Sequence, residues 1–298
     1  MSEQQEEEVG LKVLHYFGSH LVALCVAYRR ADTPNITEFS AFSGTLLRID
    51  DTVLWLSAGH VVEQVAAMIE SRSITVDECA LADAFGSSFV SERPVPISFA
   101  SARKTFVYDE ALGLDFGAVE LHPHQVRLLT ANGVRILEEV NWAYQDRVTF
   151  DGYALLGLPD EFSSAILPGD GRAEVSPTMI TIRELEEPPP GFIKPHRRLV
   201  ARILDPIALN SVVGMSGGPV IGFSIGERVR YWIVALQSTW LEGSRTTFAC
   251  PFPVFGPMLA GWVRSLDRRN PESQQIKEST IIELFHPPQA EQGPIQLR

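Results

Sequence analysis

Short runs of β-branched and aromatic residues, separated by turn residues, recur along most of the chain. Such residues are enriched in strands, and short strands with turn signals between them are typical of β-sandwiches and β-barrels. One group of runs occupies 21–28, 40–49, 52–57 and 114–121, and a second occupies 147–159, 179–185, 198–204, 217–223 and 230–239. This pattern predicts an all-β fold made of two β-domains of similar size.

Two stretches depart from the β pattern and predict helices. Within 122–140, Pro123 suits a first helical turn and Gly133 suits a helix end, so a short helix should join the two β-domains. From Pro257, apolar residues recur at helical spacing, which predicts a closing helix. We therefore expect an N-terminal extension at 1–20, a first β-domain at 21–121, a linker at 122–146, a second β-domain at 147–256, a helix at 257–268 and a tail at 269–298.

Charge and composition restrict the partners. The 298 residues are 45% hydrophobic, enough for a sizeable core, and their formal net charge of −12 opposes binding to a nucleic acid. Residues 1–10 lack the basic and apolar regions of a secretory signal, and three prolines interrupt the long uncharged stretch 246–263. Cys25, Cys79 and Cys250 are an odd number without close spacing, as expected for reduced thiols. We expect a cytoplasmic protein with no nucleic-acid partner and no membrane partner.

Ser216 stands in the segment VVGMSGGPV, residues 212–220, which crowds three glycines and a proline around it. The segment fits both the G-x-S-x-G elbow of α/β-hydrolases and the G-x-S-G-G-P of trypsin-like proteases. The elbow needs a helix directly after the serine, whereas the β-like VIGF follows here, and only Asp267 and His286 would remain downstream as partners. An esterase on the hydrolase fold is thus disfavoured, and the partners of Ser216 should lie upstream.

His60 and Asp115 are the upstream candidates. In WLSAGHVVEQV, an apolar run ends at Ser57 and delivers His60 to the start of a helical pattern, and in GLDFGAVEL, Asp115 interrupts an apolar strand. A carboxylate in apolar surroundings needs hydrogen-bond partners, and a histidine N–H would satisfy it while orienting the imidazole. Asp109 is a rival, although its more polar surroundings suit a loop. The sequence therefore predicts a triad of His60, Asp115 and Ser216 for nucleophilic catalysis.

Together, SAGH, LDFGAVEL and GMSGGP resemble the T/S-A-x-H, D-I-A-L-L and G-D-S-G-G-P motifs of chymotrypsin-like (trypsin-like) serine proteases. The resemblance spans about residues 21–266, and it implies two six-stranded antiparallel β-barrels with a short inter-barrel helix and a C-terminal helix. It also implies an oxyanion hole made by the amides of Gly214 and Ser216. Glycines in this segment keep side chains away from the N–H donors.

Two departures from the family bear on activation and redox state. Met215 stands where activatable members have an aspartate that pairs with a newly cleaved N-terminus, and no R-I-V-G-G-like site precedes the first barrel. We therefore expect no trypsinogen-type cleavage, and we expect Met215 to pack among apolar residues of the second barrel. Val61 stands where animal members have a cysteine, in keeping with reduced thiols.

The resemblance also implies a substrate pocket. It puts Asn210 near the base of S1, the pocket for the side chain before the scissile bond, with Gln237, Ser238 and Thr239 along its wall. Without a carboxylate at the base, a preference for lysine or arginine loses its electrostatic basis, and small, apolar or neutral polar side chains are expected. The segment 237–239 should also pair with an extended peptide.

These features predict a serine endopeptidase that acts on protein or peptide substrates through an acyl-enzyme. No cofactor and no metal are expected, because the histidines at 15, 20, 122 and 124 have no thiolate or carboxylate cluster beside them. The alternative is a protease-fold binding or regulatory module whose site stays dormant until a partner or ligand binds.

Overall fold

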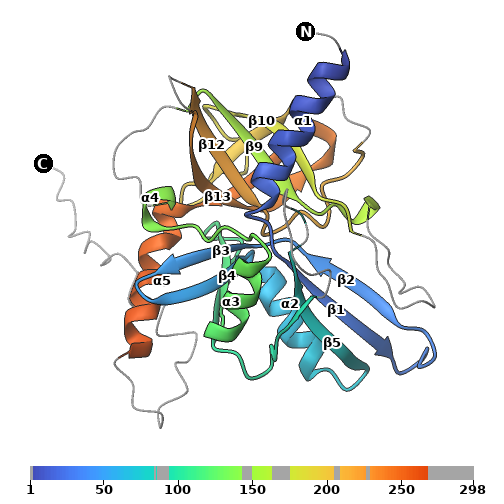
Figure 1. The fold of residues 1–298 in the computed structure, drawn as a ribbon. Helices are drawn as coiled ribbons and strands as arrows, with labels where there is room; N and C mark the ends of the chain where they lie inside the picture. Colours follow the sequence, from blue (N-terminus) through green and yellow to red (C-terminus); the bar gives the residue numbers. More distant parts are fainter. Residues whose placement is uncertain are drawn as a thin grey trace, which may run out of the picture. The chain divides into compact units, whose positions relative to one another are not determined.

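A computed structural model describes residues 3–83, 85, 94–142, 150–162, 175–204, 209–225 and 229–267. Its contacts divide the chain into a unit of Met1–Ala260, which holds every strand described, and a unit of Gly261–Arg298. Within the first unit, we call the part of the chain up to the end of strand β8 the first half, and the part from strand β9 to strand β14 the second half. Helices and turns are counted with the half in which they lie. Figure 1 colours the first half from blue to green and the second half from light green to orange.

The first half contains two four-stranded antiparallel sheets, ordered β2-β1-β5-β6 and β3-β4-β8-β7. Their strands are β1 (Ala23–Arg30), β2 (Glu38–Phe42), β3 (Thr45–Ile49), β4 (Thr52–Ser57), β5 (Ile74–Ala82), β6 (Val95–Pro96), β7 (Lys104–Asp109) and β8 (Leu114–Glu120). An antiparallel bridge between Leu21 and Thr45 links the segment before β1 to β3. Helix α2 (Gly59–Glu70) packs against β5, β7 and β8.

The core of the first half holds the start of α2 in place. Trp55 of β4 is fully buried, and its indole N–H donates to the carbonyl oxygen of Val22 over 2.9 Å, so its polar atom is satisfied. From α2, Val61, Val62 and Val65 are buried in the same apolar cluster. Because these valines recur at helical spacing, one face of α2 is fixed and its first turn keeps a defined position beside β4 and β8.

The second half is a closed six-stranded antiparallel barrel, ordered β10-β11-β14-β13-β12-β9, in which β9 also pairs with β10. Its strands are β9 (Gly152–Gly157), β10 (Thr178–Glu184), β11 (Leu199–Ile203), β12 (Pro219–Ile225), β13 (Val229–Leu241) and β14 (Thr246–Pro251). The register between β13 and β14 shifts between Gln237 and Thr239, so Ser238 is the extra residue of a β-bulge. A bulge redirects the side chain that it carries, and this one lies beside the site described below.

The remaining helical elements are α1 (Glu3–Gly18), α3 (Pro123–Ala131), α4 (Glu139–Trp142), α5 (Phe252–Asp267) and two 3₁₀ turns, η1 (Asp160–Phe162) and η2 (Glu242–Ser244). Helix α3 confirms the expected inter-barrel helix. Pro123 is in its first turn, the ring of His122 caps it by accepting the N–H of His124, and Gly133 after it has φ +90°. No helix in the described part of the chain combines the length and the apolar character needed to cross a membrane.

The β-rich class, the second barrel and the closing helix are confirmed, with three differences in detail. The first half is two sheets rather than one closed six-stranded ladder. The closing helix α5 begins at Phe252 rather than 257, because Phe252 and Phe255 are buried, and Pro257 lies inside the helix. Helix α1 occupies the expected extension, although its acidic sequence carried no periodic signal. The domain boundaries stay predictions, and the expected tail at 269–298 lies outside the described residues.

Candidate active site

His60 lies in the first turn of α2, directly after β4. The turn into the helix is tight, because a Cβ on Gly59 would lie 2.0 Å from the carbonyl oxygen of Val107. Only glycine fits there, and it lets the helix start against β7. The ring of His60 is partly exposed and lies beside Tyr108, with 5.5 Å between the ring centroids. The imidazole is therefore partly covered by Tyr108 and partly open to solvent.

Asp115 is 2% exposed in β8 and is bonded twice to His60. Its Oδ2 lies 2.8 Å from Nδ1 of His60, and its Oδ1 accepts the main-chain N–H of His60 over 3.0 Å. Because a carboxylate accepts, Nδ1 donates and Nε2 is left as an acceptor. The rival Asp109 instead accepts the N–H of Leu112 over 2.9 Å in the turn before β8. Within the described residues, the structure brings His60 together with Asp115 and not with Asp109.

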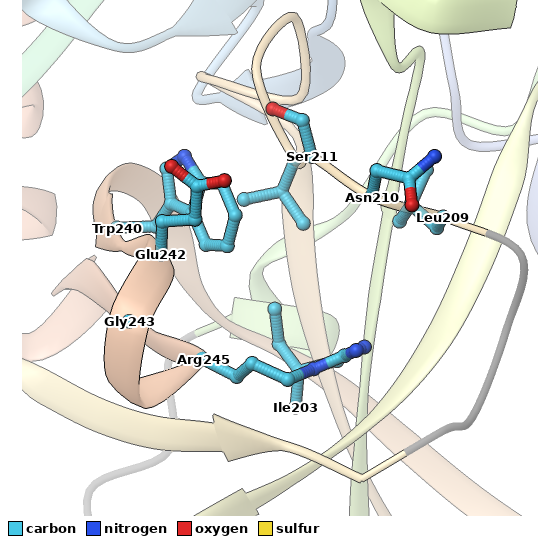
Figure 2. A pocket seen from close by; sticks show the side chains of 9 residues that line it. Ile203, Leu209, Asn210, Ser211, Trp240, Glu242, Gly243 and Arg245 are labelled. Carbon is cyan, nitrogen blue, oxygen red and sulfur yellow. The ribbon is translucent and has the colours of Figure 1, made fainter.

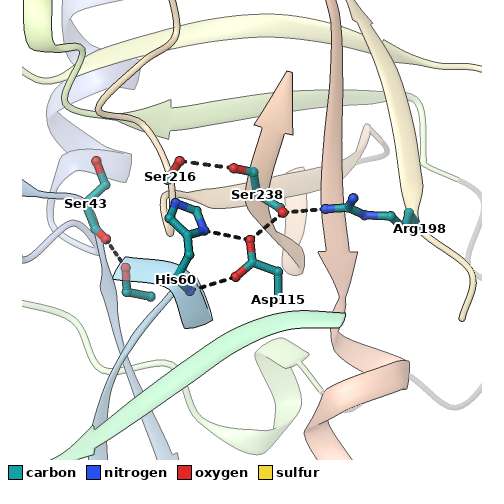
Figure 3. Close-up of polar contacts among 7 residues, drawn as sticks. Ser43, His60, Asp115, Arg198, Ser216 and Ser238 are labelled. Carbon is teal, nitrogen blue, oxygen red and sulfur yellow. Dashed lines mark hydrogen bonds and ion pairs between the residues drawn. The ribbon is translucent and has the colours of Figure 1, made fainter. Parts of the chain in front are cut away.

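A third bond to Asp115 comes from the second half. The hydroxyl of Ser238 donates to Oδ2 of Asp115 over 2.5 Å, and the guanidinium of Arg198 donates to the hydroxyl of Ser238 (Figure 3). Arg198 also lies over the ring of Phe248, 5.6 Å from its centroid. Burial lowers the pKa of Arg198 from its ordinary value, and the negative charge of Asp115 opposes that shift. The sequence predicted Ser238 in a pocket wall, but its bond to Asp115 depends on the β-bulge, which no local pattern predicts. Arg198 was not singled out, because its bond to Ser238 joins residues far apart in the chain.

Ser216 lies in the turn that precedes β12, and its hydroxyl donates to the carbonyl oxygen of Ser238 over 3.1 Å. Figure 3 shows this hydroxyl turned toward Ser238 rather than bonded to the ring of His60. Ser238 therefore contacts Asp115 through its side chain and Ser216 through its main chain. The structure thus joins His60, Asp115, Ser238 and Ser216 in one hydrogen-bond network, without a direct bond between His60 and Ser216.

The main-chain N–H groups of Gly214 and Ser216 donate to no acceptor among the residues that the structure describes. Gly214 has φ +90°, and a Cβ there would lie 2.2 Å from Oδ1 of Asp160 and 2.6 Å from the carbonyl oxygen of Leu158. Only glycine can adopt this conformation without strain. Unpaired N–H groups are rare in protein interiors, and donors left without partners are available to an anionic or carbonyl oxygen.

Met215 is fully buried in the apolar cluster of the second half. It lies against β9, where a Cβ added to Gly157 would be 3.0 Å from the Cβ of Met215. Its main-chain N–H donates to the carbonyl oxygen of Val212 over 3.1 Å. The expected packing of Met215 among second-barrel apolar residues is therefore confirmed.

A cavity of about 370 Å³ lies next to the Ser216 turn, and Figure 2 shows the side chains around it. Its lining is Ile203, Leu209, Asn210, Ser211, Val212, Trp240, Glu242, Gly243 and Arg245. Asn210 is in this lining, but it is exposed, and its side-chain and main-chain N–H groups donate to Glu161. Gln237, Ser238 and Thr239 are outside the lining, since the bulge leaves the first two buried.

Two of the four histidines that might suggest a metal, His20 and His122, have other partners in the structure. His20 bonds through both ring nitrogens, to the carbonyl oxygen of Arg135 and the hydroxyl of Tyr231. His122 caps α3. Among the described residues, no group of three or more His, Cys, Asp and Glu side chains is arranged to hold a metal ion.

No protein-family model and no curated protein matches the chain. Solved structures that resemble it include the inactive form of Rv3671c from M. tuberculosis H37Rv, at 15% identity and TM-score 0.35, over 86% of this chain and 90% of that one. A serine endoprotease from Yersinia pestis matches at 13% identity and TM-score 0.46, over 86% of this chain and 66% of that one. The thermostable serine protease AL20 from an extremophilic microorganism matches at 11% identity and TM-score 0.42, over 82% and 97%.

These likenesses are too distant to establish the fold, so the architecture rests on the arrangement of the sheets themselves. A closed six-stranded antiparallel barrel follows two antiparallel sheets, a short helix joins the halves, and a helix follows the last strand. This arrangement is consistent with the two-barrel fold of the chymotrypsin-like serine proteases.

Proposed function

We propose that the protein is a serine endopeptidase that hydrolyses peptide bonds through an acyl-enzyme. Ser216 is the nucleophile, His60 is the general base, and Asp115 orients the imidazole. The observation that carries the proposal is the pair of hydrogen bonds between His60 and the buried carboxylate of Asp115, which leaves Nε2 of His60 as an acceptor. A histidine held in this tautomer is suited to take a proton from a serine hydroxyl.

In the proposed reaction, the Ser216 hydroxyl turns from the Ser238 carbonyl to Nε2 of His60 and attacks the scissile carbonyl carbon. The hydroxyl proton passes to His60, and the N–H groups of Gly214 and Ser216 donate to the new oxyanion. His60 then gives this proton to the leaving amine as the C–N bond breaks. A water molecule, deprotonated by His60, attacks the acyl-enzyme, and the proton returns to Ser216 as the acid leaves.

The Ser238 carbonyl gives the proposed site a main-chain acceptor for substrate. Its present donor is the Ser216 hydroxyl, so turning that hydroxyl toward His60 frees the carbonyl for an N–H of an extended peptide. The adjacent cavity is lined by Glu242 and Arg245, which carry opposite charges, so its lining has no excess of one charge from this pair. Trp240 adds an apolar wall. We therefore propose that it takes an uncharged side chain.

Two further features support the proposal that the enzyme acts in the cytoplasm and without N-terminal cleavage. Cys25, Cys79 and Cys250 are all free thiols, and burial raises the pKa of each to about 12, which suits a reducing, cytoplasmic setting. Met215 fills apolar space with its side chain, so the Ser216 turn is ordered without an ion pair to a new N-terminus. The enzyme we propose therefore needs no N-terminal cleavage.

One observation favours a second candidate, a protease-fold regulatory module with a dormant site. The hydroxyl of Ser216 is bonded to Ser238 and not to His60. In this alternative, a partner protein or ligand is needed to turn the hydroxyl toward the base.

Labelling with a fluorophosphonate separates the two candidates. An active serine forms a bond from Oγ to phosphorus, fluoride leaves, and the hydroxyl proton is taken up by the histidine. We expect the full-length, uncut chain to form one adduct, mapped to Ser216 by mass spectrometry, and to cleave denatured protein. Ser216→Ala and His60→Ala should abolish both activities, whereas the control Ser101→Ala, at an exposed serine, should retain them. If Ser216 is labelled only after a partner is added, while the chain itself stays uncut, the result supports the regulatory module.

A further inference from the structure

Ser43 is a fully buried residue of the first half whose hydroxyl, in the described part of the chain, bonds only to the second half. It lies between β2 and β3, and its Oγ donates to the carbonyl oxygen of Gly214 over 3.0 Å. The same Oγ accepts the main-chain N–H of Leu158 over 2.9 Å. The carbonyl oxygen of Ser43 accepts the hydroxyl of Ser57, just before α2, over 2.8 Å. Ser43 therefore connects the start of the His60 helix with the turn that carries Ser216.

These bonds fix the two peptide groups on either side of Gly214. The carbonyl oxygen of the peptide after Gly214 is held by Ser43, and its N–H, on Met215, is held by Val212 over 3.1 Å. The carbonyl oxygen of the peptide before Gly214, on Val213, accepts the N–H of Asp160 over 2.9 Å. In a planar trans peptide, N–H and C=O point in opposite directions, so the Gly214 N–H points away from Asp160.

Gly214 is the flexible pivot between these two peptides. Its φ of +90° is open to glycine, and glycine passes readily between conformations of positive and negative φ. The hydroxyl of Ser43 is the donor to the Gly214 carbonyl oxygen among the residues described. The turn also rests on the Ser43 main chain, because a Cβ on Gly217 would lie 2.6 Å from the carbonyl oxygen of Ser43 and 1.9 Å from Oγ of Ser57.

We infer that Ser43 is a positioning residue that holds the peptide after Gly214 and so fixes the turn that presents the Gly214 and Ser216 N–H groups to an oxyanion. The inference rests on the proposed endopeptidase function and adds a residue of the first half to the control of the oxyanion donors. A serine suits this place because one hydroxyl both donates and accepts. Alanine at 43 would leave the Gly214 carbonyl and the Leu158 N–H without that shared partner, and the peptide after Gly214 would keep only the bond from the Met215 N–H to Val212.

The test compares Ser43→Ala with the control Thr45→Val in the full-length protein. Thr45 is also fully buried, and its hydroxyl also donates to a main-chain carbonyl oxygen, that of His20 over 2.7 Å, but it does not touch the Ser216 turn. We expect Ser43→Ala to lower kcat and the rate of fluorophosphonate labelling by about 10- to 100-fold, with KM changed less than about 2-fold. Thr45→Val should lower Tm by a similar amount and leave kcat and labelling unchanged.

A partial replacement provides the second readout. Ser43→Cys keeps a weak donor of similar size and should give a labelling rate between those of the wild type and Ser43→Ala. Wild-type labelling and kcat in Ser43→Ala, or in Ser43→Cys if the alanine variant does not fold, would overturn the inference while leaving the endopeptidase proposal intact. A wild-type chain that neither labels nor cleaves would overturn both, so the two failures are distinguishable.

Discussion

The two sides of the candidate site are held very differently. His60 and Asp115 belong to the first half, where α2 packs on β8 and two hydrogen bonds join the residues directly. Ser216 belongs to the second half, and its hydroxyl is bonded within that half, to Ser238. His60 and Asp115 are thus paired within one half, whereas the Ser216 hydroxyl is bonded to Ser238 and not to His60. In the reaction that we propose, the approach of Ser216 to His60 is therefore controlled at the contact between the halves.

Breaking the first-half pair should have the largest effect. Asp115→Asn keeps the shape of the side chain but can no longer hold the Nδ1–H tautomer, so we expect kcat to fall by about 10⁴-fold. Asp109→Asn is the matched control, since the Asp109 carboxylate bonds only to the Leu112 N–H among the residues that the structure describes, and it should keep kcat within about 3-fold. Steady-state kinetics on a peptide substrate measure both. If Asp115→Asn turned over normally and Asp109→Asn did not, the acid would be misassigned.

The contact between the halves should be sensitive to pH at His20, with an effect of intermediate size. His20 is buried, and its Nε2 lies 2.9 Å from the hydroxyl of Tyr231 on β13. Burial, with a smaller contribution from the charge of Arg135, lowers the pKa of His20 from 6.5 to about 4. Between these values the unfolded chain binds a proton that the folded chain does not, so stability falls as the pH decreases through this window and is unaffected above it.

Through His20, the free energy of unfolding should be lower by about 3 kcal/mol at pH 4 than at pH 7. Urea unfolding of the wild type and His20→Gln at pH 7, 5.5 and 4.5 measures it, because glutamine retains polar contacts without titrating. The free energy of unfolding of the wild type should decrease more steeply than that of the variant. Parallel curves would mean that folding does not lower the pKa of His20 and that this contact between the halves does not sense pH.

The smallest expected effect is on stability and comes from a substitution at Met215, beside Ser216 in the second half. Met215→Asp buries an unpaired carboxylate next to β9, and we expect the free energy of unfolding to fall by about 1 to 3 kcal/mol. Met215→Leu is the apolar control and should change stability by less than about 1.5 kcal/mol. Thermal unfolding and the labelling rate at Ser216 report on both. Equal stability of Met215→Asp and the wild type would contradict the packing argument.

The elements that sequence patterns predicted are those fixed by local chemistry. Pro123 and Gly133 mark the ends of a helix through backbone preferences alone, and α3 lies between them. The buried position of Asp115 follows from its apolar neighbours, and the position of His60 follows from the strand and the glycine before it. The assignment of these residues and Ser216 to one catalytic triad remains a prediction that the experiments above test.

The features that were not predicted depend on contacts between residues far apart in the chain. Ser238 was expected in the pocket wall, but a bulge, which depends on the register of β13 with β14, aims it at Asp115. Arg198 and Ser43 were not singled out, because an arginine at a strand start or a serine before a glycine carries no local signal. Their partners lie 40 residues and 171 residues away in sequence.

The bond from Ser238 to Asp115 also limits how this fold can be recombined. The carboxylate belongs to the first half and one of its three hydrogen bonds is supplied by the second, with Arg198 behind it. A chimera that joined this first half to a second half without a hydroxyl at position 238 would bury the same negative charge with one donor fewer. The halves are therefore not interchangeable modules: residues 115, 198 and 238 must be inherited, or exchanged, as a set.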